Sequence, residues 1–252
     1  GALDTAVRSG KAMYVGISSY SGAMTLECHR ICERDGLVKP IIHQPNYSML
    51  NRGIESDLLP VTGELGMGVI AFCPLAQGLL TPKYLGEIPE DSRAKQASGF
   101  LQEDRVTPEL VSQLNQLNTI AEGRGQSLAQ LALSWALRDP RMTSALIGAS
   151  RPSQITENVK AAEQVTFADD ELVAIDNALA GLSSQTKYSV LCTSLHAGSW
   201  PQPPQGWQRA MRLRPRQPPR HGPYLATASS MYWLHVGWNR QCPPSHIPND
   251  PR

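Results

Sequence analysis

Short apolar runs and longer amphipathic stretches alternate along the first 181 residues. The apolar runs cover residues 11–17, 40–44, 68–72 and 145–147, and runs of this length between turn residues are typical of buried strands. Residues with helical spacing of apolar positions lie between the runs and after the last one. Since a crossover helix between strands favours parallel pairing, the pattern predicts an α/β fold around a parallel sheet.

Capping residues mark where the helices begin. Helices are predicted over residues 21–35, 56–65 and 152–163, and from residues 107, 127 and 169 onward. Ser127 forms a capping box with Gln130, and Thr107 precedes a proline at the first helical position. Pro60 and Gly63 weaken the helix at 56–65. The helix at 21–35 has one apolar face, formed by Met24, Cys28, Ile31 and Cys32.

A long polar segment, residues 74–105, follows the third predicted strand. Loops beyond ~15 residues are uncommon in compact domains unless they cover a site. We therefore expect this segment to clamp or cover a ligand.

Composition divides the chain into residues 1–183 and 184–252. The first part contains 15 Lys or Arg and 21 Asp or Glu, whereas the second contains 8 and 1. The second part also holds 11 of the 20 prolines and has no sustained period, so we expect it to be largely disordered. Its composition favours an extension read out of frame. The alternative is a basic arm for nucleic acid, with Trp200 and Trp207 as stacking groups.

The start of the chain and its cysteines restrict the class of protein. The chain opens at Gly1 inside a helical pattern, with no signal peptide or membrane span, so we expect a cytoplasmic protein with a cut start, no membrane partner and no nucleic-acid partner. Five scattered cysteines do not make a disulfide framework. Cys28, His29 and Cys32 allow a metal or redox site, whereas packing of the helix explains them without one.

Small and polar residues follow each predicted strand. They are Ser18-Ser19, Gln44, Cys73 to Gly78, and Gly148 to Arg151. Ligands of parallel α/β folds bind at the carboxyl ends of the strands. The fourth segment also opens a helix, where free backbone N–H groups beside a serine and an arginine favour a phosphate. The four strand ends together predict one ligand site.

Four motifs resemble the second half of an aldo-keto reductase. They are GISSYS at 16–21, HQPNYSMLNR at 43–52, CPLAQGLLTPKYL at 73–85 and IGASRPSQITENV at 147–159. Within the family they are most similar to bacterial L-glyceraldehyde 3-phosphate reductases and to β subunits of voltage-gated potassium channels. The resemblance implies an (α/β)8 TIM barrel, of which residues 1–183 hold strands five to eight. It also implies reduction of a small aldehyde or ketone with NADP(H).

The resemblance assigns cofactor contacts at all four strand ends. Ser18, Ser19 and Gln44 would hold the nicotinamide carboxamide, whose donors and acceptors they match. The 2′-phosphate would meet Ser150 and Arg151 beside Gly148, which favours NADP over NAD. The pyrophosphate would be wrapped by Cys73, Pro74, Leu75, Ala76, Gln77, Gly78 and Leu79, with Lys83 in support, and the adenosine would contact Gln154, Glu157 and Asn158.

Each of these residues has a structural alternative. Gln44 also suits a buried structural amide, and Lys83 and Arg151 also suit solvated surface charges. The spacing of Gln154, Glu157 and Asn158 is that of an exposed helix face. The Tyr47-Ser48 pair departs from the Tyr-Asn pair usual in the family.

No catalytic residue is assigned to this chain. By resemblance, the aspartate, tyrosine, lysine and histidine of the family's tetrad lie on the first four strands, which the chain lacks. Half a barrel leaves strand edges unpaired, so we expect marginal stability and leave an oligomer open. Two functions follow: a reductase whose cofactor-binding half is inactive alone, or a non-catalytic NADP-binding regulatory module like a channel β subunit.

Overall fold

The computed structural model describes residues 1–86, 88, 101, 106–181 and 231–235. Its first half contains α1 (Ala2–Arg8), β1 (Gly16–Ser18), α2 (Gly22–Arg34), β2 (Ile42–Gln44), α3 (Leu58–Glu64) and β3 (Gly68–Phe72). Next come the 3-10 turns η1 (Ala76–Gly78) and η2 (Pro82–Tyr84). The second half contains α4 (Pro108–Gly123), α5 (Leu128–Leu137), β4 (Met142–Gly148), α6 (Pro152–Val159), the 3-10 turn η5 (Lys160–Glu163), α7 (Asp169–Ala178) and β5 (Met231–His235).

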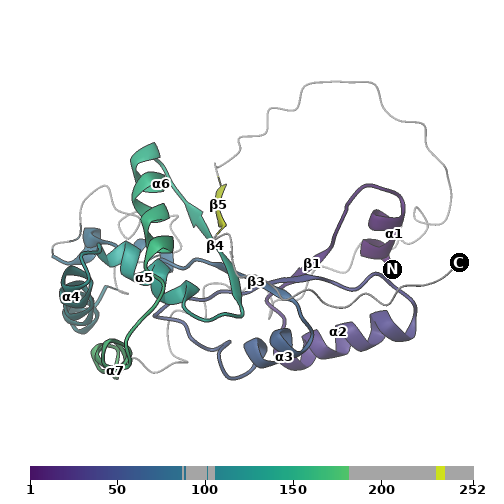
Figure 1. The fold of residues 1–252 in the computed structure, drawn as a ribbon, viewed down its shortest axis with the longest axis horizontal. Coiled ribbons are helices and arrows are strands. Elements are labelled where there is room, and N and C mark those ends of the chain that lie inside the picture. The colour runs from purple at the N-terminus through teal and green to yellow at the C-terminus, as the bar shows by residue number, and fades with distance from the viewer. Residues whose placement is uncertain (87, 89–100, 102–105, 182–230, 236–252) are drawn as a thin grey trace, which may run out of the picture.

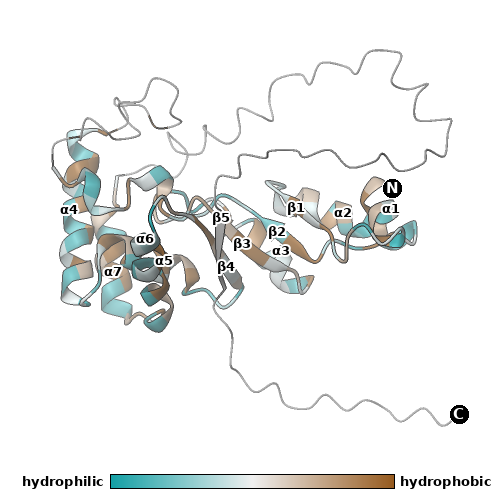
Figure 2. Ribbon diagram, turned by 90° about the horizontal axis from the view of Figure 1, so that it is seen from above, coloured by the Kyte–Doolittle hydropathy of each residue, from teal (hydrophilic) through white to brown (hydrophobic). Residues whose placement is uncertain are grey.

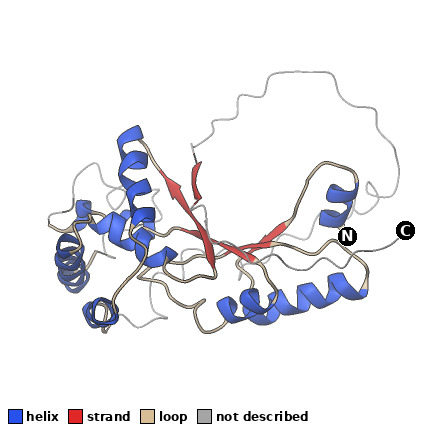
Figure 3. Cartoon of the chain, in the orientation of Figure 1, coloured by secondary structure: helices blue, strands red, loops and turns tan. Residues whose placement is uncertain are grey.

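The strands form one sheet in the order β1-β2-β3-β4-β5. The first four strands pair in parallel, as the sequence pattern predicts, and β5 pairs with β4 in the antiparallel sense. Figure 3 shows the strands in the middle of the molecule with helices on the outside. In Figures 1 and 2, α4 to α7 gather near β3 and β4, while α1 and α2 lie at the β1 end.

The core lies between the sheet and α5. Nine of the ten residues of α5 are buried, among them Leu131 and Trp135, because this helix packs directly against β4 and against neighbouring helices. In Figure 2, α4 carries hydrophobic and hydrophilic residues on different faces. Its buried positions, Leu110, Leu114, Leu117 and Ala121, follow the helical period.

The helix starts predicted from capping residues are confirmed. The helix predicted over residues 21–35 is α2, and its cap is Ser21, whose side chain accepts from the Met24 amide. Thr107 accepts from the Leu110 amide. Ser127 and Gln130 exchange both hydrogen bonds of the capping box. In α3, Pro60 is the third helical residue, where its missing N–H costs no intrahelical bond.

Two predictions of burial at the β1 end of the sheet are wrong. The buried strand expected over residues 11–17 is reduced to β1, and the side chains of Met13 and Tyr14 are 81% and 67% exposed. Among the described residues β1 pairs only with β2, so no second strand of this part of the chain extends it. On α2, Met24 and Ile31 are exposed and only Cys32 of the expected apolar face is buried.

Two predictions on long segments are corrected in part. The segment 74–105 begins with η1 and η2, whose neighbourhood buries Leu79, Leu80 and Tyr84, so its first part is packed core rather than a polar loop. The rest of it lies mostly outside the described residues. Within the segment expected to be disordered, residues 231–235 form β5. The remainder of 184–252 lies outside the described residues.

Candidate functional site at the strand ends

The carboxyl ends of β1 and β2 are joined by hydrogen bonds. Ser18 and Gln44 are register partners, and the Ser18 hydroxyl donates to the Gln44 carbonyl oxygen over 2.7 Å. The Ser19 amide donates to the same oxygen over 3.3 Å. These bonds fix the backbone and leave Ser18 and Ser19 exposed beside the half-buried Gln44. The two serine hydroxyls lie 3.4 Å apart beside the end of β2. Together with Gln44 they are residue types whose donors and acceptors suit a nicotinamide carboxamide.

The end of β3 is held against the segment that follows β2. The Phe72 amide donates to the Pro45 carbonyl over 2.9 Å, and the Tyr47 amide donates to the Phe72 carbonyl over 3.3 Å. Phe72 is also the register partner of Leu146 in β4. Cys73, the first residue after β3, therefore starts between the ends of β2 and β4.

The turn after β3 has an unusual backbone. Cys73, Ala76 and Gln77 have positive φ angles of 55°, 47° and 62°. Within the described residues, the only other non-glycine residue with positive φ is Ser19, directly after β1. Such backbone strain concentrates at functional sites. The amides of Ala76, Gly78 and Leu79 donate to carbonyl oxygens within the same turn. In this turn Gly78 has φ 98°, where any side chain would be strained.

The end of β4 presents donors around one acceptor. The backbone amides of Ser150 and Arg151 donate to the Gln154 Oε1 atom over 2.8 and 3.2 Å. The Ser150 hydroxyl also lies 3.2 Å from this oxygen. The carboxamide oxygen therefore stands where a phosphate oxygen would receive the same three bonds, at the N-terminus of α6. An anion at this position must displace Gln154.

The remaining predicted residues lie on α6 and η2. Glu157 is exposed, whereas Asn158 is only 6% exposed and faces the protein. The Gln130 side chain donates to the Glu157 carbonyl over 2.9 Å, which ties α6 to α5. The structural alternative, an exposed helix face formed by Gln154, Glu157 and Asn158, therefore does not hold for Asn158. Lys83 is exposed in η2.

His43 is a buried titratable group beside the site. It lies in β2 next to Gln44, with 0% of its surface exposed. Neither ring nitrogen has a well-placed hydrogen-bond partner among the described residues. Burial lowers the His43 pKa to about 4, and the nearby Tyr20 backbone opposes this effect only weakly.

Two features escaped the sequence analysis. The first is the set of three bonds to Gln154 Oε1. Gln154 lies three residues after the cap residue Arg151, which is the spacing of a capping box. Strand β5 has the aromatic and apolar sequence MYWLH, and such a run is a strand signal. In both cases a local pattern lay inside a segment that the sequence analysis interpreted differently, as an anion site in the first case and as a disordered extension in the second.

Two further kinds of feature were sought among the described residues, a metal centre and a membrane-spanning helix. Within them, no group of three or more His, Cys, Asp or Glu side chains could hold a metal ion. None of the helices in the described ranges is long and apolar enough to cross a bilayer.

Comparison with known proteins agrees with this geometry. The chain is 48% identical over 185 residues to L-glyceraldehyde 3-phosphate reductase of Escherichia coli strain K12, covering 71% of this chain and 53% of that protein. It is 39% identical over 171 residues to a putative voltage-gated potassium channel subunit beta of Schizosaccharomyces pombe, covering 66% and 50%. A probable subunit of the same kind from Oryza sativa subsp. japonica is 36% identical over 175 residues, covering 68% and 53%.

The family match covers the first part of the chain. The chain spans about half the length of these curated relatives. The family profile described as "Aldo/keto reductase family" matches residues 1–180, the range that contains the four parallel strands and their carboxyl ends. The chain therefore belongs to the aldo/keto reductase family.

Proposed function

We propose that this chain forms the NADP(H)-binding half of an oxidoreductase that reduces a small aldehyde or ketone. The observation that carries the proposal is the set of donors at the end of β4, where two backbone amides and a hydroxyl surround one oxygen. Arg151 lies exposed beside them. A 2′-phosphate needs both donors and positive charge, so this end of the sheet suits NADP better than NAD.

The other strand ends supply the remaining contacts of the proposal. Ser18, Ser19 and Gln44 hold the carboxamide and so fix which face of the nicotinamide is presented. The left-handed turn after β3 lies against the pyrophosphate in this proposal, and the exposed Lys83 adds positive charge. When bound, NADPH supplies a hydride to the carbonyl carbon. The chain's own residues bind and orient the cofactor, and we assign none of them to proton transfer.

The proposal extends to the fold. Four adjacent parallel strands with their helices match strands five to eight of an (α/β)8 barrel, so we propose that residues 1–183 are part of such a barrel. The proton donor and the groups that tune it then belong to the other half, as the family resemblance implies. This chain alone is accordingly expected to bind cofactor without turnover.

Titration of the full chain with NADPH and NADH, followed by cofactor fluorescence, tests the proposal. We expect tighter binding of NADPH, and Arg151→Ala should weaken it about tenfold or more while leaving NADH binding unchanged. Arg141→Ala is the matched control, because Arg141 is an exposed arginine before β4, paired with Asp139. Equal affinity for both cofactors, or equal effects of the two variants, would contradict the NADP assignment.

A second candidate function is regulation of a partner by the bound cofactor. It is favoured by the two matched relatives that are named as potassium channel β subunits. Both candidates require cofactor binding, so the discriminating experiment adds an aldehyde to the NADPH complex of the intact protein. Cofactor oxidation supports the reductase, and binding without oxidation supports the regulatory module.

A further inference from the structure

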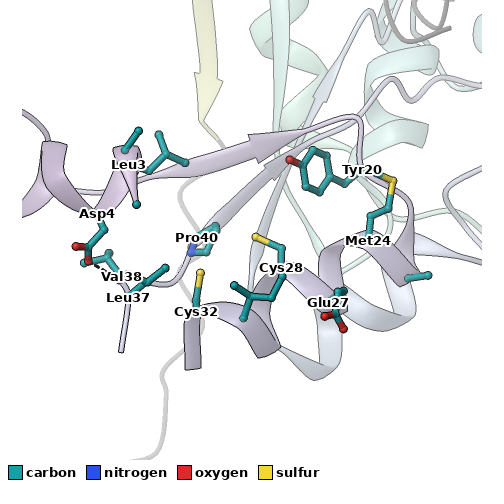
Figure 4. A pocket seen from close by; sticks show the side chains of 14 residues that line it. Leu3, Asp4, Tyr20, Met24, Glu27, Cys28, Cys32, Leu37, Val38 and Pro40 are labelled. Atoms are coloured by element: carbon teal, nitrogen blue, oxygen red, sulfur yellow. Dashed lines mark hydrogen bonds between the residues drawn. The ribbon is translucent and has the colours of Figure 1, made fainter. Parts of the chain in front are cut away.

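A groove separates α1 from α2 at the β1 end of the molecule. Its volume is about 660 Å³, and its walls come from α1, α2 and residues 37–40. None of these segments supplies a residue of the proposed cofactor site. Figure 4 shows the groove at close range. It is lined by Leu3 and Asp4 of α1, by Met24, Glu27, Cys28, Ile31 and Cys32 of α2, and by Tyr20, Leu37, Val38 and Pro40 among others.

Polar contacts at the ends of the groove hold α1 in place. Asp4 accepts from the Val38 amide over 2.9 Å, and Arg8 donates to the Gly36 carbonyl over 2.9 Å. α1 itself has no buried residue. The apolar side chains of the two helices therefore face an open space instead of one another. An apolar substituent of a ligand fits such a space.

Two thiols lie one helical turn apart on the floor of the groove. Cys28 and Cys32 are both free, Cys28 half-buried and Cys32 buried. Figure 4 shows their sulfur atoms on the same side of α2. Burial and the neighbouring Cys32 raise the Cys28 pKa, so the Cys28 thiol is protonated at neutral pH.

The geometry of this pair disfavours a disulfide. Side chains at i and i+4 of a helix have Cβ atoms about 5–6 Å apart, whereas a disulfide needs about 3.5–4.5 Å. An atom bonded to both sulfurs separates them further than a direct S–S bond does. The two Cβ atoms can then keep their helical separation, so the helix stays intact. Since the described residues bring no third ligand, a tetrahedral zinc site is also disfavoured.

We propose that Cys28 and Cys32 chelate a thiophilic centre that takes two sulfur ligands, with a trivalent organic arsenical as the class of ligand. In phenylarsine oxide, the arsenic–oxygen bonds break and two arsenic–sulfur bonds form. The two thiol protons leave with the oxygen as water, and arsenic stays trivalent. The phenyl group occupies the third position on arsenic and lies in the apolar groove between Leu3 and Ile31.

The test uses the reduced full chain, phenylarsine oxide and intact-mass spectrometry after a wash with excess monothiol. We expect one phenylarsenic group per chain, resistant to the monothiol and released by 2,3-dimercaptopropanol. The second sulfur bond is intramolecular, so Cys28→Ser or Cys32→Ser should weaken retention about 100-fold or more. Cys28→Ala repeats the test with a side chain that needs no hydrogen bond, and circular dichroism checks that each variant keeps its helix content.

Matched controls use the remaining cysteines. Cys73→Ser and the double variant Cys192→Ser/Cys242→Ser should retain the group as the wild type does. Leu3→Ser should lower the affinity for phenylarsine oxide about fivefold, because it removes apolar contact with the ring, and should leave arsenite binding unchanged. Retention in the Cys28 or Cys32 variants at the wild-type level, or release of the group by monothiol alone, would overturn the proposal.

Discussion

At the scale of single residues, the burial of His43 makes the stability of the fold depend on pH. The unfolded-state pKa of histidine is about 6.5, and burial in β2 lowers the folded-state value to about 4. The neutral ring is therefore favoured in the fold. The stability gained by keeping the ring neutral is fully present above pH 6.5 and is lost as the pH falls from 6.5 toward 4.

We expect His43→Gln to remove this pH dependence. Between pH 7 and pH 4.5 the wild-type chain should lose on the order of 2 kcal/mol more unfolding free energy than the variant, since one pKa unit corresponds to about 1.4 kcal/mol. Urea unfolding at several pH values measures the difference. Parallel curves for the two proteins would show that His43 does not titrate this way.

The buried Tyr47 side chain is hydrogen-bonded to two charged residues, Glu55 and Arg138. Its hydroxyl donates to Glu55 over 2.8 Å and accepts from Arg138 over 2.9 Å. The ring stacks on Trp135 with centroids 5.4 Å apart, and the Arg138 guanidinium lies 3.7 Å from the centroid of the same indole. Burial raises the Tyr47 pKa, so the hydroxyl remains a donor throughout the physiological range.

Removing this hydroxyl should cost stability. Tyr47→Phe leaves Glu55 and Arg138 paired with each other at 3.1 Å but deletes two hydrogen bonds to charged groups, so we expect a loss of about 2 kcal/mol. Tyr14→Phe is the control, because that ring is 67% exposed. Chemical denaturation of both variants distinguishes the two positions. A loss in Tyr14→Phe equal to that in Tyr47→Phe would exclude a role for these hydrogen bonds.

At the scale of elements, signals contained within a few residues predicted the structure well. Caps at Thr107 and Ser127 depend on hydrogen bonds within one turn, so the sequence sufficed to place these helix starts. Strand β1 and the apolar face of α2 depend on neighbours supplied by the rest of the fold. Their extent and burial could not be read from periodicity, which reports what a segment is able to bury and not what lies beside it.

The capping box of α5 provides a test of such a local signal. Ser127→Ala should lower the free energy of unfolding by about 1 kcal/mol, because the Gln130 amide loses its acceptor. Ser112→Ala, at an exposed position inside α4, should be neutral or slightly stabilising since alanine favours helix interiors. Thermal melts followed by circular dichroism compare the two. Equal losses would mean that the cap contributes nothing specific.

The adjacency of the four strand ends could be predicted from the sequence, whereas the burial of β1 and α2 could not. Four strand ends meet because parallel strands align their carboxyl ends, which makes adjacency a consequence of topology. The left-handed backbone of Ala76 and Gln77 was not predictable, because neither residue type favours positive φ. The spacing of a capping box indicates that Gln154 bonds to the start of α6, but it does not indicate that the Ser150 amide and hydroxyl join the same oxygen.

At the scale of the whole molecule, the sheet has two different edges. β5 pairs along β4 from Ser144 to Gly148 and so satisfies backbone groups that a parallel neighbour would satisfy in a closed barrel. The β1 edge has no partner strand among the described residues. Pairing with another chain is therefore favoured at β1 and disfavoured at β4.

Removal of β5 should change how the chain associates. A chain ending at residue 183 exposes the β4 edge, so we expect it to form larger oligomers than the full chain at equal concentration. Multi-angle light scattering after size exclusion measures this. Full-length Trp233→Pro/Leu234→Pro provides the matched test, because proline cannot donate to the ladder. Unchanged masses in both proteins would contradict a protective role for β5.

The bonds to the Gln154 carboxamide have a consequence for which anions α6 accepts. The carboxamide belongs to the same helix, so it competes with any anion for the donors of Ser150 and Arg151. Its effective concentration is fixed by the chain and does not depend on the solution. A weakly bound monovalent ion gains little by replacing it. A dianionic phosphate gains charge-assisted hydrogen bonds and the nearby arginine. Under the proposed function, the glutamine therefore discriminates by charge, because small monovalent ions would not displace it whereas a phosphate would.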